Sequence, residues 1–256
     1  MPYIGGNGIL TSLAASNYVN VDMAGVVGSD IGISKLSKLL GSSIALDNVD
    51  VLDGESFKYD ATYSKKSAEL IQEETNFGVY QNYSPNVNGG FYAGQAVFCG
   101  GNPKHALTFI EQILDPGPIA VSTLLYHLKK TNEYALKLID KASILFTNKM
   151  EYQFLLENLG EEPLSYFKKL ECIFNTNGSK GVDVIFSDGH SVFFRPPKVV
   201  TPLNPTNAGD VFAGTVVGML SAGYKLSEDL NQIVKSAGTE AVKVILNDGY
   251  YRRVIP

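Results

Sequence analysis

A chain of 256 residues can form one large domain, and its 45% hydrophobic and 18% charged residues are typical of a globular protein. The formal net charge of −5 and the lack of a basic run argue against a nucleic-acid-binding protein, which needs Lys and Arg to neutralise phosphates. The sequence has no apolar run of the roughly 18 residues that a membrane-spanning helix needs, and its start does not resemble a signal peptide.

The cysteines and histidines are few. Cys99 and Cys172 lie in apolar, strand-like runs, which predicts buried free thiols and a reducing, cytoplasmic location. The three histidines do not have the spacing of metal ligands, so a zinc site is not expected.

Strand-like and helix-like runs alternate along most of the chain. Residues 31–40 predict an amphipathic helix, and a second helix is expected to begin at Pro103 with Leu107, Ile110 and Leu114 on one face. The alternation predicts an α/β fold with a mostly parallel sheet and helices on both faces, in which ligands bind at the carboxyl ends of the strands. The expected strands lie at residues 19–28, 96–99, 119–121, 144–146 and 172–174.

Two segments break this alternation. Residues 49–83 show strand-like alternation around a polar stretch, which predicts a short β-rich excursion. Residues 182–194 predict a hairpin, because the dipeptide Asp188-Gly189 between two alternating runs is a strong turn signal. The sequence contains no internal repeat and no low-complexity linker, so we predict a single domain over residues 1–256.

The most informative stretch is residues 204–214, which combine a turn, a tight small-residue loop, one acidic residue and a helix-like run. Ala208 and Gly209 would let the backbone approach a ligand, and free N–H groups at the helix start favour an anion. Asp210 lies in the first helical turn, beside that expected anion site. The combination suits phosphoryl transfer, in which a carboxylate takes the proton of an alcohol while amides stabilise the phosphoryl charge. The alternative is an ordinary helix start that carries an Asp.

This stretch resembles the C-terminal signature of the ribokinase-like (PfkB-type) carbohydrate kinase family, Asp-Thr-x-Gly-Ala-Gly-Asp. The Ala208-Gly209-Asp210 core is intact, whereas Asn204 and Asn207 stand where the family has Asp and Gly. Asn tolerates left-handed backbone angles, so we expect Asn207 to keep the loop shape. Asn204 lacks the charge with which the family's Asp helps to hold a monovalent cation, which argues against potassium activation.

The resemblance covers nearly the whole chain. It implies a three-layer ribokinase-like α/β fold with a small β lid over the sugar, here reduced and located around residues 49–83. Gly5-Gly6-Asn7 resembles the family's Gly-Gly-Asn, whose backbone and Asn side chain contact the sugar, and residues 26–32 resemble its Val-Gly-x-Asp-x-x-Gly stretch. In the family a first strand, usually with an Asp that binds acceptor hydroxyls, precedes these glycines. Either this strand lies upstream of the given sequence or it is absent.

Asn148 and Glu151 follow the apolar run at residues 144–146 and resemble the family's Asn-x-x-Glu motif. The resemblance implies that they organise hydrated Mg²⁺ near the phosphates. The alternative is a capping box, in which an Asn and a Glu three residues apart satisfy the free N–H groups at a helix start. The two interpretations are compatible.

Thr176, Gly178, Lys180 and Gly181 follow the apolar run at residues 172–174 and resemble the family's Thr-x-Gly-x-x-Gly nucleotide loop. The glycines would let the backbone approach ATP, and Lys180 would meet phosphate charge. The glycine spacing does not fit a Walker loop or a dinucleotide fingerprint. The alternative is a plain glycine-rich loop into the next strand.

The resemblance therefore implies ATP-dependent phosphoryl transfer to a hydroxyl of a sugar, sugar acid or nucleoside. Asp210 would be the general base, the amides of Asn207, Ala208 and Gly209 would stabilise the phosphoryl oxygens, and ATP and Mg²⁺ would be required. The alternative is a catalytically inactive relative that binds a sugar or nucleotide, which Asn204 and the reduced lid favour and Asp210 disfavours. An uncovered lid sheet would offer strand edges to a second copy, so a homodimer through the lid is compatible with the sequence.

Overall fold

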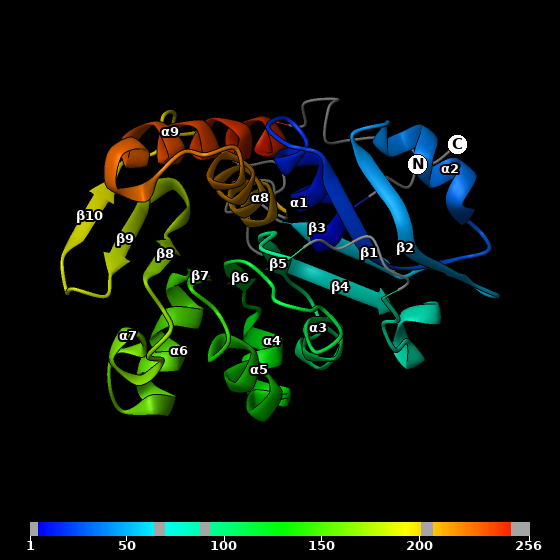
Figure 1. Ribbon diagram of the computed structural model, residues 1–256, viewed down its shortest axis with the longest axis horizontal. Coiled ribbons are helices and arrows are strands. Elements are labelled where there is room, and N and C mark those ends of the chain that lie inside the picture. Colours follow the sequence, from blue (N-terminus) through cyan, green and yellow to red (C-terminus); the bar gives the residue numbers. More distant parts are fainter. Residues whose placement is uncertain (1–4, 64–69, 88–92, 201–206, 247–256) are drawn as a thin grey trace. The chain divides into compact units, whose positions relative to one another are not determined.

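The computed structural model describes residues 5–63, 70–87, 93–200 and 207–246 (Figure 1). The chain forms two compact units. The first unit contains Met1–Gly90 and Lys198–Pro256, and the second contains Phe91–Pro197. That these two units together form a single domain stays a prediction.

The second unit is built on a six-stranded sheet with the order β10-β9-β8-β7-β6-β5. The strands from β5 to β8 are parallel, whereas β9 is antiparallel to both β8 and β10. This arrangement confirms the mostly parallel sheet and the hairpin predicted at residues 182–194. The strands are β5 (Val97–Cys99), β6 (Ile119–Ser122), β7 (Ile144–Asn148), β8 (Cys172–Thr176), β9 (Val182–Phe186) and β10 (Ser191–Phe194).

Helices connect these strands and cover an apolar core that includes Leu145, Leu155, Phe167 and Ile173. Cys99 and Cys172 are buried free thiols, as expected. The α-helices are α3 (Pro103–Ile110), α4 (Leu125–Lys130), α5 (Asn132–Ile139), α6 (Lys149–Leu159) and α7 (Pro163–Tyr166), and the short 3₁₀ helix η2 spans Gly178–Lys180. In the part of the chain that the structure describes, no helix is long and apolar enough to cross a membrane.

Helix α3 begins at Pro103, as predicted, where the side chain of Asn102 accepts a hydrogen bond from the backbone N–H of Lys104. The expectation that Leu114 shares its buried face was wrong. The helix ends at Ile110, and Leu114 is 88% exposed. Beyond this end, Asp115 takes a positive φ of 49° and is followed by a proline, which disfavours helical angles in the preceding residue, so a helix could not have continued past this point.

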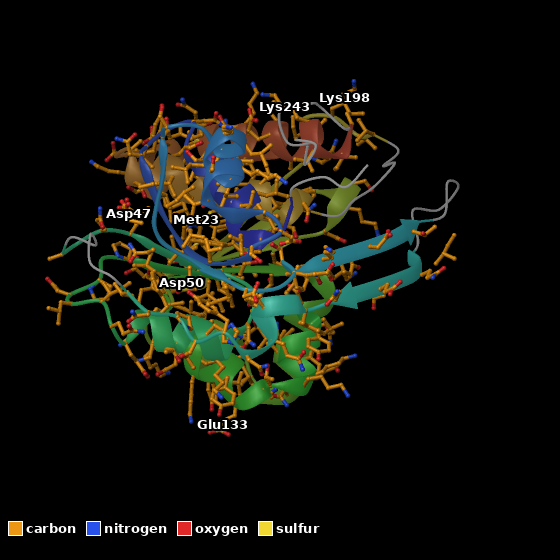
Figure 2. All side chains as sticks on the ribbon, turned by 90° about the vertical axis from the view of Figure 1, so that its right-hand side faces the viewer. Met23, Asp47, Asp50, Glu133, Lys198 and Lys243 are labelled. Carbon is orange, nitrogen blue, oxygen red and sulfur yellow. The ribbon has the colours of Figure 1, made fainter. Side chains whose placement is uncertain are left out.

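The first unit contains the parallel pair β1 (Val21–Gly28) and β2 (Ile44–Leu52), which α2 (Gly32–Leu40) connects. The helices α1 (Asn7–Ala15), α8 (Ala208–Ser221) and α9 (Leu226–Ile245) complete it. Its core contains Leu10, Leu13, Leu36 and Val211, together with Met23 (Figure 2). These elements bring the start of the described chain beside α8.

Helices α1 and α8 pack with their backbones in close contact. A Cβ atom at Gly214 would lie 2.4 Å from the backbone O of Thr11, and one at Gly218 would lie 2.8 Å from the Cα of Ala15. Only glycine fits at these two positions of α8. This close approach sets the register between the two helices, and it therefore fixes which residues meet at their N-terminal ends.

The segment at residues 49–83 contains the end of β2, the antiparallel hairpin of β3 (Lys58–Tyr63) and β4 (Leu70–Asn76), and the 3₁₀ helix η1 (Gly78–Asn82). Tyr83 follows η1 and donates its hydroxyl to the backbone O of Gly25 in β1. The β-rich character of the segment is as predicted. Its role as a lid stays a prediction.

Candidate active site

Asp210 lies in the first turn of α8, directly after a left-handed residue. Asn207 has φ 74° and ψ −5°, which confirms that Asn takes the left-handed angles expected at this loop position. Its side chain does not cap the helix. No described atom lies within 4 Å of a Cβ built at Gly209, so the backbone at Gly209 faces open space. Asn204 and the two residues after it lie outside the described residues.

The carboxylate of Asp210 contacts α1. Asn7 Nδ2 donates to Asp210 Oδ1 at 2.5 Å, and Thr11 Oγ1 donates to the backbone O of Asp210 at 3.3 Å. The net pKa of Asp210 is raised to about 6. Burial raises this pKa, and the hydrogen bond from Asn7 opposes part of the rise. A carboxylate with a pKa near neutral pH is ionised at pH 7 and is better matched to proton transfer than an ordinary Asp.

The two glycines before Asn7 lie close to the same site. Gly6 has φ 94°, a left-handed angle that favours glycine, and it caps the start of α1. A Cβ at Gly5 would lie 3.9 Å from Nδ2 of Asn207. The structure thus brings the Gly5-Gly6-Asn7 motif and the residues 207–210 together, although the two segments lie far apart in the sequence.

A second cluster of predicted residues lies at the carboxyl ends of β6, β7 and β8 in the second unit. Asn148 accepts from the backbone N–H groups of Met150 and Glu151, and Glu151 Oε2 accepts from the backbone N–H of Asn148 at 2.9 Å. This is a complete capping box. The cap interpretation is therefore confirmed, and the proposed metal role remains compatible with it.

Glu151 is 5% exposed, which is rare for a carboxylate. Thr123, directly after β6, donates its Oγ1 to Glu151 Oε2 at 3.0 Å. Burial raises the pKa of Glu151 to about 7, and the hydrogen bonds from Asn148 and Thr123 lower it in part. A nearby cation would favour the charged form of this carboxyl group. Sequence reasoning missed Thr123, and its place at the end of a buried parallel strand was the available signal.

The predicted nucleotide loop lies beside this cluster. Asn148 and Thr176 are register partners at the ends of β7 and β8, and Thr176 Oγ1 donates to the backbone O of Thr147 at 3.1 Å. Gly178 and Gly181 have φ angles of 52° and 126°. A Cβ at Gly181 would lie 2.1 Å from the backbone O of Phe194 in β10, so only glycine fits there.

Lys180 is exposed at the end of the short helix η2. Its charge is available to an anion, because no ion pair of Lys180 is formed among the described residues. The loop therefore offers an exposed cation at Lys180 close to the exposed Gly178, at which no described atom lies within 4 Å of a built Cβ, whereas Gly181 is buried.

The residues present suit a hydrated metal ion better than a directly bound one. No group of three or more His, Cys, Asp or Glu side chains that could hold a metal ion occurs among the described residues. Mg²⁺ usually keeps several waters and binds through one or two protein oxygens together with substrate phosphates. Asn148 and Glu151 lie at the start of α6, and the prediction that they hold the waters of a hydrated Mg²⁺ does not require either side chain to bind the ion directly.

A comparison with protein families decides the classification, because residues 2–249 match the pfkB family carbohydrate kinase. The chain belongs to the pfkB family of carbohydrate kinases. It is thus a kinase that transfers a phosphoryl group to an alcohol.

Solved structures agree on the fold of this pfkB kinase. A nucleoside kinase from Methanocaldococcus jannaschii, an archaeal member of the ribokinase family, superposes with a TM-score of 0.80 at 21% identity, over 98% of this chain and 83% of that one. The nucleoside kinase of Burkholderia thailandensis in complex with inosine gives 0.75 at 16% identity, over 97% and 82%. The ribokinase of Cryptococcus neoformans in complex with ADP gives 0.74 at 19%, over 93% and 82%. These similarities show the ribokinase-like α/β fold.

Proposed function

We propose that this kinase transfers the γ-phosphoryl group of ATP to a hydroxyl of a sugar, sugar acid or nucleoside, with Asp210 as the general base. The observation that carries the proposal is the position of Asp210. Its carboxylate, with a pKa of about 6, lies in the first turn of α8 and is held by Asn7. One structurally similar kinase was solved in complex with inosine and another in complex with ADP. A nucleoside is therefore the first acceptor to test, and an adenine nucleotide the first phosphoryl donor.

Asp210 Oδ1 accepts from Asn7, which leaves Oδ2 for the hydroxyl of the acceptor. As the acceptor oxygen forms its bond to the γ-phosphorus, the bond from that phosphorus to the bridging oxygen of ADP breaks, and the hydroxyl proton passes to Asp210. The backbone N–H groups of Asn207, Ala208 and Gly209 would donate to the oxygens of the transferring group. Gly5, Gly6 and Asn7, beside this base, would contact the acceptor.

The second cluster would bind the phosphoryl donor. Thr176, Gly178, Lys180 and Gly181 would contact ATP, with the backbone of the glycines and the charge of Lys180 turned to the phosphates. Bound Mg²⁺ would neutralise phosphate charge. The side chains of Asn148 and Glu151 would accept hydrogen bonds from the waters of that ion, which requires Glu151 to be ionised.

The hairpin of β3 and β4 would cover the acceptor. Covering the acceptor excludes water, which would otherwise take the phosphoryl group and waste ATP. A homodimer through this hairpin stays a prediction, and a mass measurement in solution that shows a monomer would exclude it.

The test is ADP release with ATP and Mg²⁺ across hexoses, pentoses, sugar acids and nucleosides, with Asp210→Asn beside the parent. We expect acceptor-dependent ADP release that falls by about a hundredfold to ten-thousandfold in the variant, the usual contribution of a general base. No ADP with any acceptor, from folded protein that still binds ATP, would support the inactive binding relative instead. A variant as active as the parent would remove the role of Asp210.

A further inference from the structure

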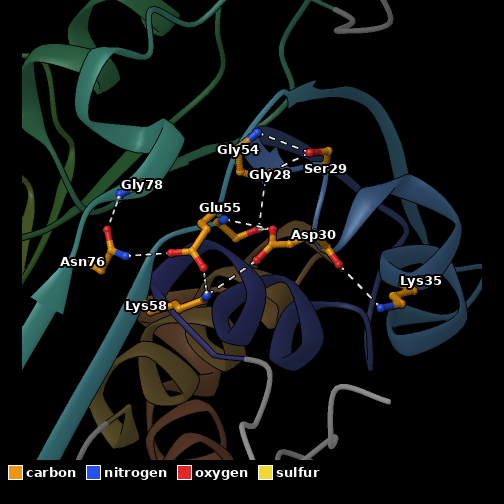
Figure 3. A network of polar contacts seen from close by, with 10 residues as sticks. Gly28, Ser29, Asp30, Lys35, Gly54, Glu55, Lys58, Asn76 and Gly78 are labelled. Atoms are coloured by element: carbon orange, nitrogen blue, oxygen red, sulfur yellow. Dashed lines mark hydrogen bonds and ion pairs between the residues drawn. The ribbon is translucent and has the colours of Figure 1, made fainter.

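The turn between β1 and α2 carries a carboxylate that reaches the segment leading into the β3–β4 hairpin (Figure 3). Asp30 Oδ1 accepts from the backbone N–H of Ser56 at 2.9 Å and from its hydroxyl at 2.7 Å. Ser56 is 4% exposed, and its Oγ also accepts from the backbone N–H of Gly28 at 2.8 Å. The serine thus links the end of β1 to the carboxylate, and Asp30 is the acceptor that satisfies both donors of this buried residue.

The second oxygen of Asp30 faces the first residue of β3. Lys58 Nζ lies 3.8 Å from Asp30 Oδ2 and 2.8 Å from Glu55 Oε1. Burial raises the pKa of Asp30, but the hydrogen bonds from Ser56 and the charge of Lys58 outweigh it and leave the pKa below its usual value. The carboxylate is therefore ionised at neutral pH and attracts Lys58 at the start of the hairpin.

The returning strand is held at the same place. Asn76, the last residue of β4, donates to Glu55 Oε2 at 2.9 Å, and the backbone N–H of Val79 donates to the backbone O of Glu55. Both ends of the hairpin are thus fixed within a few residues of Ser56. A hydrogen-bonded hairpin of two strands is barely stable by itself, so its orientation depends on such attachments.

Glycines allow the end of β1 and the start of η1 to lie in close contact with the segment of residues 54–56. A Cβ at Gly28 would lie 2.3 Å from the backbone O of Gly54 and 2.5 Å from the backbone N of Ser56. A Cβ at Gly78, where φ is 48°, would lie 2.1 Å from the backbone O of Glu55. The strand ends are therefore in direct backbone contact at the root of the hairpin, and a small displacement there would change the position of its far end.

We propose that Asp30 is a positioning residue for acceptor binding, which holds the root of the β3–β4 hairpin through Ser56 and Lys58 in the orientation that covers the acceptor. This inference rests on the proposed function, in which the hairpin is the lid. Asp30 acts through the hairpin and does not touch the reacting atoms. Its loss therefore weakens contacts that the acceptor makes equally before and during the reaction, and such contacts affect KM more than kcat.

The test compares Asp30→Ala, Asp30→Asn and Ser56→Ala with Asp47→Ala as the matched control. Asp47 lies on β2 in the same unit, and its side chain is exposed (Figure 2). An Asn at position 30 keeps an oxygen that accepts from Ser56 and loses only the charge that attracts Lys58, so its effect is expected to be the smaller one. Asp30→Asn and Ser56→Ala also keep the inference testable if Asp30→Ala does not fold.

Two measurements are made on each protein. Amide hydrogen exchange at residues 58–63 and 70–76 reports on the hairpin without requiring activity, and steady-state kinetics give KM for the acceptor and for ATP. We expect faster exchange in Asp30→Ala and Ser56→Ala, with KM for the acceptor raised about tenfold, which corresponds to about 1.4 kcal/mol. The KM for ATP and kcat should change by less than about threefold. The control should match the parent in both measurements.

Unchanged exchange in Asp30→Ala and Ser56→Ala would overturn the inference, because the hairpin would then not depend on this attachment. Faster exchange with an unchanged KM for the acceptor would also overturn it, since the hairpin would move without consequence for the acceptor. Failure of the proposed function gives a different result. The parent would then release no acceptor-dependent ADP, while the exchange measurement would still show whether Asp30 holds the hairpin.

Discussion

The side-chain amide of Asn7 donates to the carboxylate of Asp210, a residue 203 positions further along the chain. Each residue lies in the first turn of its helix, and Gly214 and Gly218 let these two helices pack in contact. Burial raises the pKa of Asp210, and the hydrogen bond from Asn7 opposes that effect. Asn7 therefore sets the fraction of the proposed base that is ionised near neutral pH.

Replacing Asn7 with Ala should raise the pKa of Asp210 further above its present value of about 6. The base works only when it is ionised, so the acidic limb of the profile of kcat/KM against pH should move to higher pH. Activity should fall more at pH 6 than at pH 8. A profile lowered equally at all pH values would show that Asn7 only binds the acceptor. Asn231→Ala, at an exposed position of α9, is the control and should leave the profile unchanged.

Glu151 allows the capping and metal roles to be separated. Glu151→Gln keeps a side-chain oxygen for the backbone N–H of Asn148, since Gln also serves in a capping box, but it removes the charge. We expect Glu151→Gln to fold normally and to lose most of its Mg²⁺-dependent activity. Glu151→Ala should lose stability as well, by about 0.5–2 kcal/mol for a missing cap. A Gln variant with the kinetics of the parent would leave Glu151 a structural cap only.

The same variant tests the pH dependence of stability. The pKa of Glu151 in the folded protein, about 7, lies above its ordinary value of 4.5. Its contribution to stability is therefore fully present below about pH 4.5 and is lost as the pH rises through about 7. Without metal, the stability of Glu151→Gln relative to the parent should therefore be greater at pH 8 than at pH 5. Thermal unfolding in the presence of a chelator at both pH values measures this difference. An equal difference at the two pH values would contradict the raised pKa.

The sequence predicted the features of the site that local chemistry determines. Asn207 is left-handed because Asn tolerates that region, and Asn148 and Glu151 form a capping box because their spacing places them at one helix start. The Asp188-Gly189 turn likewise produced the expected hairpin. Each of these outcomes depends on residues at most a few positions apart.

Contacts between distant segments could not be predicted in this way. Asn7 meets Asp210 because a glycine in α8 lies against Thr11, and Thr123 meets Glu151 because β6 and β7 are neighbours in the sheet. The spacing of residues along one element contains no information about the register between two elements. The length of α3 is different, since the helix ends at Ile110 although the apolar periodicity extended to Leu114. The Asp-Pro pair at residues 115–116 was visible in the sequence and limited how far a helix could extend, but the observed end lies before it.

Gly214→Ala should destabilise the first unit, because its Cβ would lie 2.4 Å from the backbone O of Thr11. Overpacking of this kind typically costs about 1–3 kcal/mol. Gly8→Ala in α1 is the matched control, since no described atom lies within 4 Å of a Cβ built at the exposed Gly8. Alanine should stabilise the helix there by up to about 1 kcal/mol. Urea unfolding measures both effects. If the two variants are equally stable, α1 and α8 can move apart to accommodate the added Cβ at little cost.

The hydroxyl of Thr123 has one hydrogen and two acceptors within reach, Glu151 Oε2 at 3.0 Å and the backbone O of Phe146 at 3.3 Å. Ionised Glu151 is the stronger acceptor, because hydrogen bonds to charged groups are stronger than those between neutral groups. Thr123→Val removes the donor and leaves a buried carboxylate less satisfied, which should cost about 1–3 kcal/mol when Glu151 is ionised.

The cost of Thr123→Val should therefore be larger at pH 8 than at pH 5, where Glu151 is mostly protonated, and Thr123→Ser should restore stability because it returns the hydroxyl. Urea unfolding of the three proteins at both pH values makes the comparison. If Thr123→Val destabilises the protein equally at the two pH values, the hydroxyl serves Phe146 and not the carboxylate. In that case Glu151 would be held by its capping contacts with Asn148, and Thr123 would have no part in tuning its charge.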